Sequence, residues 1–522
     1  MGKINLLDCT LRDGGYINDW NFGNAQIKNI IKKLCMTGID YIEVGFLKNV
    51  VYDPDKTLFP DIETAEKLLT DISDKTKFVV MVDMSSPVPI DTIPSYNGGL
   101  IDGIRVIFKK NKLSDGFCYC DQLLKKGYRV FANFVSTDSY SDKEFIEAIE
   151  LFNKIRPTGV TIVDTFGSIK RKQFRRLLML ADNNLNPDIM LCYHAHNNLQ
   201  QAMSNAEYMA EMNLKRQIII DACVFGMGRG AGNLNLELFA EYMNENMGTS
   251  YHIPPMLEIM DENLSVFYRT KFWGYSLPLY LSASLSLHPN YAIYYAEKNT
   301  LPTYHFYELL KTISDEDKYV FTRETAEKYY REFFKNFVDD SEAIKQLEKE
   351  FAGKEVLLIA PGKSIIDYAD RIKSYYSQHR KVVLLNFFKD DFLADYIFVS
   401  NMRRFNRQIS FPNCRIIATS NISENIKSDY IVNFVSYTGN KSELFDNSGL
   451  MLLRLLSKIG VKKIYIAGMD GYSSDYGKNY FDSSFEATHL SVADYRNQMI
   501  KNELNEIATQ INLTFITPSA YQ

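Results

Sequence analysis

Two histidines separated by one residue are the clearest candidates for chemistry in this sequence. His194 and His196 follow an apolar run, residues 189–193, whose composition indicates a β-strand. Side chains two positions apart on a strand point to the same face, so both imidazoles can reach one metal ion. Imidazole is a preferred ligand for divalent transition metals. The pair therefore indicates a metal site, and the alternative is a pair of solvated or structural histidines.

An acidic motif near the N-terminus offers an oxygen ligand for such a site. Residues 8–16 have the sequence Asp-Cys-Thr-Leu-Arg-Asp-Gly-Gly-Tyr and begin where the first apolar run ends. Asp13 offers a hard carboxylate ligand, and the guanidinium of Arg12 can stabilise a developing enolate oxygen. The alternative interpretation of this motif is a tight turn capped by carboxylates.

Further polar residues stand at the ends of later apolar runs. Glu43 lies where it could orient Arg12 through a bidentate ion pair. Asn133, Asp164 and Thr165 are candidate walls of a substrate pocket, although each alone also fits a cap or a loop residue.

A glycine-rich turn follows the last of these runs. Residues 226–233 have the sequence Gly-Met-Gly-Arg-Gly-Ala-Gly-Asn. The spacing of the glycines and their place after a late strand argue against a dinucleotide-binding fingerprint. A turn that delivers Asn233 toward the metal fits better.

The elements that would position these residues are short apolar runs separated by segments of helical periodicity. The runs predicted to be strands are residues 4–8, 41–45, 78–82, 103–107, 130–134, 159–163, 189–193 and 218–222. Eight evenly spaced β/α units predict a closed (β/α)₈ TIM barrel, in which catalytic groups sit at the carboxyl ends of the strands. A doubly wound sheet is the structural alternative.

Composition limits the class of protein. The 522 residues carry a formal net charge of −5 and no polybasic stretch, so no nucleic-acid partner is expected. No apolar run is long enough for a membrane span, and seven scattered cysteines fit a reducing cytoplasm better than a disulfide framework. We also expect a homo-oligomer.

Four separated motifs resemble the signature of the DRE-TIM metallolyase superfamily, which includes 4-hydroxy-2-oxovalerate aldolase, HMG-CoA lyase and isopropylmalate synthase. They are Leu-Arg-Asp-Gly at 11–14, Glu43, His-Ala-His-Asn at 194–197, and the turn at 226–233. The resemblance covers roughly the first half of the chain. The glycine-rich turn looks most like that of the 4-hydroxy-2-oxovalerate aldolases.

The resemblance implies a divalent metal ion, commonly Mn²⁺ or Mg²⁺, with Co²⁺ or Zn²⁺ also compatible with mixed ligands. It implies that this ion is held by Asp13, His194 and His196, with Asn233 close by. It further implies that Arg12 steadies a pyruvate-like enolate and that Glu43 orients Arg12.

The sequence departs from the aldolase pattern at one catalytic position. Those aldolases carry a histidine as base two residues after the Arg-Asp-Gly triplet, and here that position is Tyr16. A phenol is a poor base at neutral pH unless a metal or cation lowers its pKa. Tyr16 is therefore a tuned base, a substrate-binding group, or a bystander while another group, such as a metal-bound hydroxide, moves the proton.

The chain is predicted to have three parts: a barrel over residues 1–250, a helical extension and linker over 251–350, and a Rossmann-like α/β domain over 351–522. Tyr291 in the extension is a candidate substrate-binding residue, since the resembling aldolases contribute a tyrosine from this region. Core packing is the alternative role for Tyr291.

The third part loosely resembles the Rossmann-like domains of bacterial sialyltransferase-type and related nucleotide-sugar proteins. Residues 361–364, Pro-Gly-Lys-Ser, lack the first glycine of a Walker A loop, yet a turn between a strand and a helix can present N–H groups to phosphate. A nucleotide-sugar or phosphorylated-sugar site is predicted there. Its candidate residues are Gly362, Lys363, Ser364, Asn401 and Asp470.

The first half is thus predicted to be a metal-dependent aldolase or lyase that joins or cleaves a 2-oxo acid and an aldehyde. The attached third part suggests a sugar-like aldehyde and a role in polysaccharide biosynthesis. A Claisen-type acyltransferase is one alternative. A catalytically inactive barrel that serves as a scaffold for a glycosyltransferase-like domain is the other.

Overall fold

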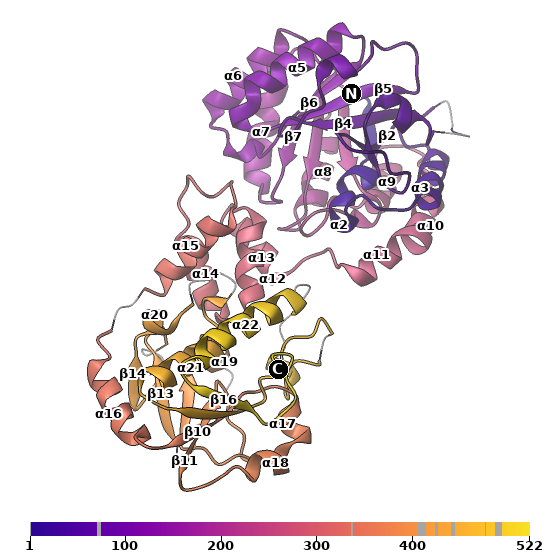
Figure 1. Ribbon diagram of the computed structural model, residues 1–522. Coiled ribbons are helices and arrows are strands. Elements are labelled where there is room, and N and C mark those ends of the chain that lie inside the picture. The colour runs from indigo at the N-terminus through magenta and orange to yellow at the C-terminus, as the bar shows by residue number, and fades with distance from the viewer. Residues whose placement is uncertain are drawn as a thin grey trace. The chain divides into compact units, whose positions relative to one another are not determined.

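The strands of the first half close into a parallel barrel (Figure 1). Strand β1 pairs with β9 on one side and with β2 on the other, which closes the ring, and the short β3 (Leu58–Phe59) pairs with β2 outside it. The barrel strands are β1 (Ile4–Asp8), β2 (Tyr41–Leu47), β4 (Lys77–Asp83), β5 (Ile101–Phe108), β6 (Arg129–Phe134), β7 (Gly159–Asp164), β8 (Met190–Ala195) and β9 (Ile218–Ala222). The predicted TIM barrel is confirmed, and a doubly wound sheet for this half is wrong.

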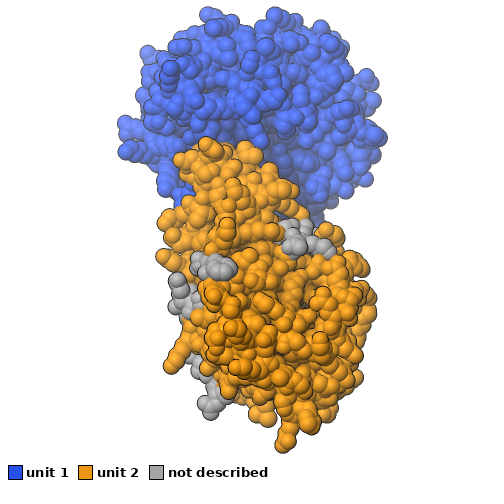
Figure 2. Space-filling view, turned by 60° about the vertical axis from the view of Figure 1, so that its left-hand side comes forward, with its two compact units in different colours: residues 1–289 blue, residues 290–522 orange. Residues whose placement is uncertain are grey.

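The structure is a computed structural model. It describes residues 2–69, 72, 75–335, 338–405, 414–422, 426–439, 444–475, 477–485 and 493–522. The chain divides into two compact units, residues 1–289 and 290–522, which Figure 2 colours separately. The predicted extension over residues 251–350 is shared between them.

Amphipathic helices cover the outside of the barrel. They are α3 (Asn24–Met36), α4 (Ile62–Glu66), α5 (Leu113–Lys125), α6 (Asp142–Asn153), α7 (Arg171–Asn184), α8 (Ala202–Glu211) and α9 (Leu236–Asn246). Helix α6 shows how the sequence specifies them. Ser141 and Glu144 form a reciprocal capping box at its start, and Phe145, Ile149 and Phe152 recur on one buried face.

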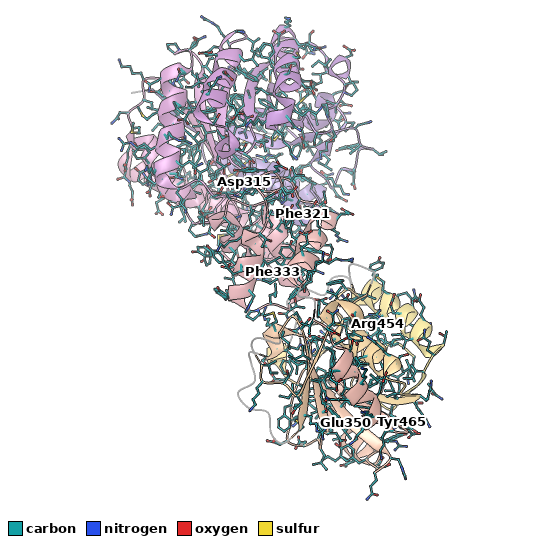
Figure 3. The ribbon with its side chains drawn as sticks, turned by 90° about the vertical axis from the view of Figure 1, so that its left-hand side faces the viewer. Asp315, Phe321, Phe333, Glu350, Arg454 and Tyr465 are labelled. Atoms are coloured by element: carbon teal, nitrogen blue, oxygen red, sulfur yellow. The ribbon has the colours of Figure 1, made fainter. Side chains whose placement is uncertain are left out.

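The residues after the barrel are helical, as predicted. The first unit holds α10 (Pro254–Glu258), a π-helical turn (Ile259–Leu264), α11 (Ser265–Thr270) and α12 (Leu277–Ser284). Helices α13 (Pro289–Lys298), α14 (Thr303–Lys311), α15 (Arg323–Phe333) and α16 (Ser341–Phe351) lead into the second sheet. Glu350 in α16 accepts hydrogen bonds from the hydroxyls of Tyr396 and Tyr430, the latter at 2.7 Å, and so ties this helix to the sheet (Figure 3).

The second unit contains a seven-stranded sheet, and all its strands are parallel. In spatial order the strands are β14 (Tyr430–Val432), β13 (Arg415–Thr419), β12 (Tyr396–Val399), β11 (Arg380–Leu385), β10 (Glu355–Ile359), β15 (Lys463–Ala467) and β16 (Asn512–Phe515). The order reverses between β10 and β15. In open α/β sheets ligands bind at such a reversal, outside the carboxyl ends of the strands.

The helices of the second unit include α21 (Ser448–Lys458) and α22 (Ala493–Ala508), which pack against each other. Within the described ranges, no helix combines the length and the apolar character that crossing a bilayer requires.

Replacing Phe134 by alanine should destabilise the barrel unit by about 3–5 kcal/mol. Phe134 is fully buried and its ring contacts Phe108, Phe145 and Phe152, so the substitution leaves a cavity. Trp20 and Trp273, the two tryptophans of the chain, both lie in the first unit. Urea unfolding followed by tryptophan fluorescence therefore measures this unit.

The matched control is Leu238→Ala on α9, whose side chain is 52% exposed. It should change the free energy of unfolding by no more than about 0.5 kcal/mol. Equal effects of the two substitutions would contradict the assignment of Phe134 to the core.

Candidate metal centre

The barrel brings three predicted ligands together at the carboxyl ends of its strands. Asp13 lies in the short helical turn after β1, His194 lies on β8, and His196 follows β8 directly. Their ligating atoms lie within 4.8 Å of one another, and all three residues are buried. The Oδ2 atom of Asp13 is 4.0 Å from His194 Nε2 and 3.7 Å from His196 Nε2. Strand parallelism explains this convergence, because it places all eight carboxyl ends at one rim.

Both imidazoles are oriented through the nitrogen that faces away from Asp13. His194 Nδ1 lies 3.1 Å from Asp221 Oδ2, and His196 Nδ1 lies 3.1 Å from the carbonyl oxygen of Arg229. Such partners fix the ring and its tautomer in metal sites. Burial lowers the pKa of His196 to about 4, which keeps its imidazole in the neutral form that can bind a metal ion.

Asn233 reaches the same cluster from the glycine-rich turn. Its Nδ2 donates to Asp13 Oδ2 at 2.5 Å and to the carbonyl of Met227 at 3.1 Å, while its buried Oδ1 has no hydrogen-bond partner among the described residues. The turn needs glycine at 228, since a Cβ there would lie 2.1 Å from Asn233 Nδ2 and 3.0 Å from Asp13 Oδ2.

Arg12 connects the ligand Asp13 to Glu43. Its Nη1 donates to Asp13 Oδ1 at 2.7 Å and its Nε donates to Glu43 Oε2 at 2.6 Å. The bidentate pair expected between Arg12 and Glu43 is wrong, because one oxygen of Glu43 serves two guanidinium groups. The second belongs to Arg105, whose Nη1 donates to Glu43 Oε2 at 3.2 Å.

Arg105 and Asp221 are site residues that the sequence analysis missed. Arg105 is 2% exposed, and its Nη2 donates to Asn133 Oδ1 at 3.2 Å and to the carboxylate of Asp221. Asp221 in turn orients His194. The sequence did contain a signal for both, because each is a charged residue inside an apolar strand. Charged side chains are rarely buried unless they are paired, so each was a candidate for a buried ion pair.

The charges of this network do not cancel. Two guanidinium groups, of Arg12 and Arg105, face three carboxylates, of Asp13, Glu43 and Asp221. Burial raises the pKa of Asp13, but the positive charge of Arg12, helped by the neighbouring imidazoles and the hydrogen bond from Asn233, outweighs burial and holds it well below its usual range. One buried negative charge is left over. Together with two imidazole nitrogens and an amide oxygen, this is a ligand set that fits a divalent metal ion.

Tyr16 lies beside this network, with its ring against Trp20 at a centroid separation of 4.8 Å. Burial, followed by the charge of Asp13, raises the pKa of Tyr16 to about 12. Its phenol is therefore protonated at neutral pH and can donate a hydrogen bond, which does not suit the role of a tuned base.

The other residues predicted to line the substrate pocket have structural partners. Asp164 accepts hydrogen bonds from the N–H groups of Ser168 at 2.8 Å and Ile169 at 3.1 Å, so its carboxylate caps its own loop. Thr165 Oγ1 accepts from the N–H of Ser136 at 2.7 Å. Asn133 accepts a hydrogen bond from Arg105 and so belongs to the charged network beneath the candidate metal ligands.

Tyr291 belongs to the second unit. It is buried there, and its hydroxyl donates to the carbonyls of Asp317 at 3.3 Å and Val320 at 2.9 Å. Its ring packs on Phe321, at a centroid distance of 5.2 Å. These contacts are those of a packing residue, the alternative role that the sequence left open.

The residues predicted to bind a nucleotide also have partners within the second unit. The N–H of Ser364 donates to Asp470 Oδ2 at 2.7 Å, and its hydroxyl donates to the same carboxylate. Lys363 Nζ donates to the carbonyl of Gly477 at 3.1 Å. Asn401 Oδ1 accepts from the N–H of Arg404 at 3.1 Å. The N–H of Ser364, which the sequence predicted to bind phosphate, thus already donates a hydrogen bond to the carboxylate of Asp470.

Comparison with known proteins agrees with this geometry. Residues 122–260 match the HMGL-like family model. The match runs from α5 to the π-helical turn that follows α10. Oxaloacetate decarboxylase of Mycobacterium tuberculosis is 23% identical over 234 residues, 44% of this chain and 67% of that protein. 4-Hydroxy-2-oxovalerate aldolase 2 of Salinispora arenicola is 24% identical over 241 residues, 46% of this chain and 68% of that protein.

Among solved structures, HMG-CoA lyase of Bacillus subtilis is similar, with a TM-score of 0.41 and 15% identity over 51% of this chain and 93% of that one. The family model and the relatives confirm the resemblance of the barrel to the DRE-TIM metallolyases. Together with the buried Asp–His–His cluster, the family model and the relatives confirm the expected divalent metal ion.

Replacing His194 or His196 by alanine should abolish stoichiometric binding of a divalent metal ion, because each change removes one of the clustered donors. Isothermal titration with Mn²⁺, repeated with Mg²⁺, Co²⁺ and Zn²⁺, measures this binding. His252→Ala is the control, since His252 is exposed, and it should bind as the wild type does. Unchanged binding by both site variants would contradict the assigned centre.

Replacing Asp221 by asparagine should weaken metal binding by about 10–100-fold without abolishing it, because His194 loses the carboxylate that orients it. The same titration measures the effect. Asp188→Asn, at a side chain that is 57% exposed, is the matched control and should leave the affinity unchanged.

Proposed function

We propose that the barrel is a divalent-metal-dependent aldolase or lyase that forms or cleaves a carbon–carbon bond through a pyruvate-type enolate. The observation that carries this proposal is the sharing of Asp13 between two systems. One oxygen faces the imidazoles of His194 and His196, and the other accepts from Arg12. A metal site and an anion-stabilising guanidinium therefore lie side by side in a buried place.

A metal ion held by Asp13, His194 and His196 supplies Lewis-acid polarisation of the oxygens of a bound 2-oxo acid. The remaining chemistry falls to residues of the chain. Arg12 is fixed through Nε and Nη1, and no partner for its Nη2 is found among the described residues. That edge is available for the negative charge that develops on the substrate oxygen, and preorganised charge of this kind is most effective away from water.

Glu43 and Arg105 act as positioning residues. Glu43 accepts from both guanidinium groups, and Arg105 links it to the Asp221 that orients His194. The anion-stabilising and metal-holding sides of the site are thereby connected through one rigid, buried network. Tyr16, protonated at neutral pH, suits a donor to substrate oxygen.

In the cleavage direction, a 4-hydroxy-2-oxo acid gives the proton of its hydroxyl to a solvent water, the C3–C4 bond breaks, and an aldehyde departs. The bonding electrons remain with the three-carbon fragment as an enolate, which then takes a proton at C3. The reverse sequence adds the enolate to an aldehyde. A sugar-like aldehyde and a place in polysaccharide biosynthesis are proposed from the second unit, whose pocket is lined by amide and hydroxyl side chains.

With a bound divalent metal, the wild type should exchange the C3 protons of pyruvate with deuterium, because enolate formation needs no aldehyde. Proton NMR in D₂O measures the exchange, and metal in buffer alone gives the background rate. Absence of exchange in metal-saturated protein would overturn the aldolase proposal. If such a protein consumes acyl-CoA, the result favours acyl transfer from a thioester. If it does not, the result favours a scaffold role.

Arg12→Gln should slow this exchange by about 10²–10³-fold, since the charge that stabilises the enolate oxygen is lost. Arg269→Gln changes an exposed arginine and should leave the rate unchanged. Metal titration of the same samples separates loss of enolate stabilisation from loss of the ion. Exchange at the wild-type rate in Arg12→Gln would remove Arg12 from the proposed mechanism.

A further inference from the structure

A polar pocket lies at the carboxyl ends of β10, β11 and β15 in the second unit. Gly362, Asn386 and Gly468, each just beyond one of these strands, line it. The pocket therefore coincides with the reversal of strand order between β10 and β15, the place where open parallel sheets bind ligands. It lies in a different unit from the barrel site, and nothing in the proposed aldolase chemistry uses it.

The floor of the pocket is formed by two loops that approach each other closely. The N–H of Gly362 donates to the carbonyl of Gly468 at 2.9 Å. A Cβ at Gly468, whose φ is +70°, would lie 2.0 Å from the carbonyl oxygen of Ala360. Glycine is required here because the backbones themselves meet, and this leaves the space above the loops clear of side chains.

Two guanidinium groups line the pocket without a carboxylate partner among the described residues. Arg404 lies over the ring of Tyr480, 4.3 Å from its centroid, and Arg496 lies over the ring of Tyr472, at 5.5 Å. Aromatic stacking fixes the direction of each side chain and leaves its N–H groups available. The N–H groups of both guanidinium groups can therefore bind an anion in the pocket.

The acidic residues of the same pocket are already engaged. Asp470 accepts from the N–H and hydroxyl of Ser364, and Asp446 accepts from the hydroxyl of Tyr330. Glu297 also has a partner of its own. Lys298, the remaining cation, is paired with Glu327 at 2.6 Å. Among the described residues no carboxylate pairs with Arg404 or Arg496, so these two guanidinium groups are the cations of the pocket that can hold an anion.

We propose that this pocket binds a small phosphate-bearing ligand, with the phosphate held by Arg404 and Arg496. Guanidinium groups match phosphate oxygens in geometry and charge, and the first turn of α21, at Ser448 and Gly449, adds the positive end of a helix. The amides of Asn386 and Asn401 suit a hydroxyl-rich or heterocyclic body. The phosphate is therefore placed away from the Ser364 turn, where Asp470 supplies a negative charge.

Calorimetry on the full chain tests this site with UMP, CMP, GMP, UDP, glucose 1-phosphate and inorganic phosphate, and with uridine and glucose as matched compounds without phosphate. We expect saturable binding of at least one phosphorylated probe and none of its unphosphorylated partner. If nucleotides bind and glucose 1-phosphate does not, the pocket is a nucleotide site. If glucose 1-phosphate binds and nucleotides do not, it is a sugar-phosphate site. Failure of all phosphorylated probes, or equal binding of the unphosphorylated partner, overturns the proposal.

Arg404→Gln and Arg496→Gln should each weaken binding of the successful probe by about tenfold to a hundredfold, the value of a charge-assisted hydrogen bond. Arg404→Lys and Arg496→Lys should retain part of the affinity, because the positive charge is kept. If circular dichroism shows that a glutamine variant is unfolded, the lysine variant at the same position replaces it in the test. Arg371→Gln, at an exposed arginine of the same unit, is the control and should bind as the wild type does.

Wild-type affinity in all four site variants overturns the assignment of the phosphate to these arginines. Deuterium exchange of pyruvate, measured on the same samples, should be unchanged in every variant, because the barrel residues are untouched. The outcome for this pocket is thereby independent of the outcome for the aldolase proposal.

Discussion

The candidate site depends on how one buried carboxylate, Asp13, is neutralised. It accepts from Arg12 on one oxygen, while the other faces two imidazoles and the amide of Asn233. The wider network keeps one negative charge more than its guanidinium groups cancel. Leaving such a charge buried is costly, and a divalent cation between Asp13 and the imidazoles relieves it. The same excess of negative charge explains why the guanidinium of Arg12 can lie so close to the candidate metal ligands.

The closed barrel makes this arrangement possible. Asp13, His194 and Asn233 come from segments widely separated in sequence, yet parallel strands bring their ends to one rim. Asp221 and Arg105 lie inside strands and hold His194 and Glu43 from beneath. The candidate ligands are therefore oriented by buried charged residues that belong to the strands of the barrel.

The second unit uses the other common arrangement of parallel strands. Its sheet is open, so its ligand position is a reversal of strand order rather than the mouth of a cylinder. Here too the distribution of charge is decisive. Asp470, in the loop after β15, places its carboxylate against Ser364 in the turn after β10, whereas Arg404 and Arg496 remain unpaired by carboxylates in the described part of the pocket. The two units thus present different chemistry, one centred on a buried carboxylate and one on half-buried guanidinium groups.

The sequence by itself determined the number and spacing of the barrel strands, because a parallel strand that is buried on both faces shows an unbroken run of apolar residues. It also indicated the candidate ligands, since His194 and His196 are two residues apart at a predicted strand end and Asp13 follows another, and the resemblance to the DRE-TIM metallolyases implied that they share one metal ion. Tertiary structure alone decided the partners of those residues. The links from Arg105 to Glu43 and Asp221, from Asp470 to Ser364, and from Tyr291 to Asp317 and Val320 join positions distant along the chain. No local pattern encodes such contacts, because they arise only when the strands and loops are packed together.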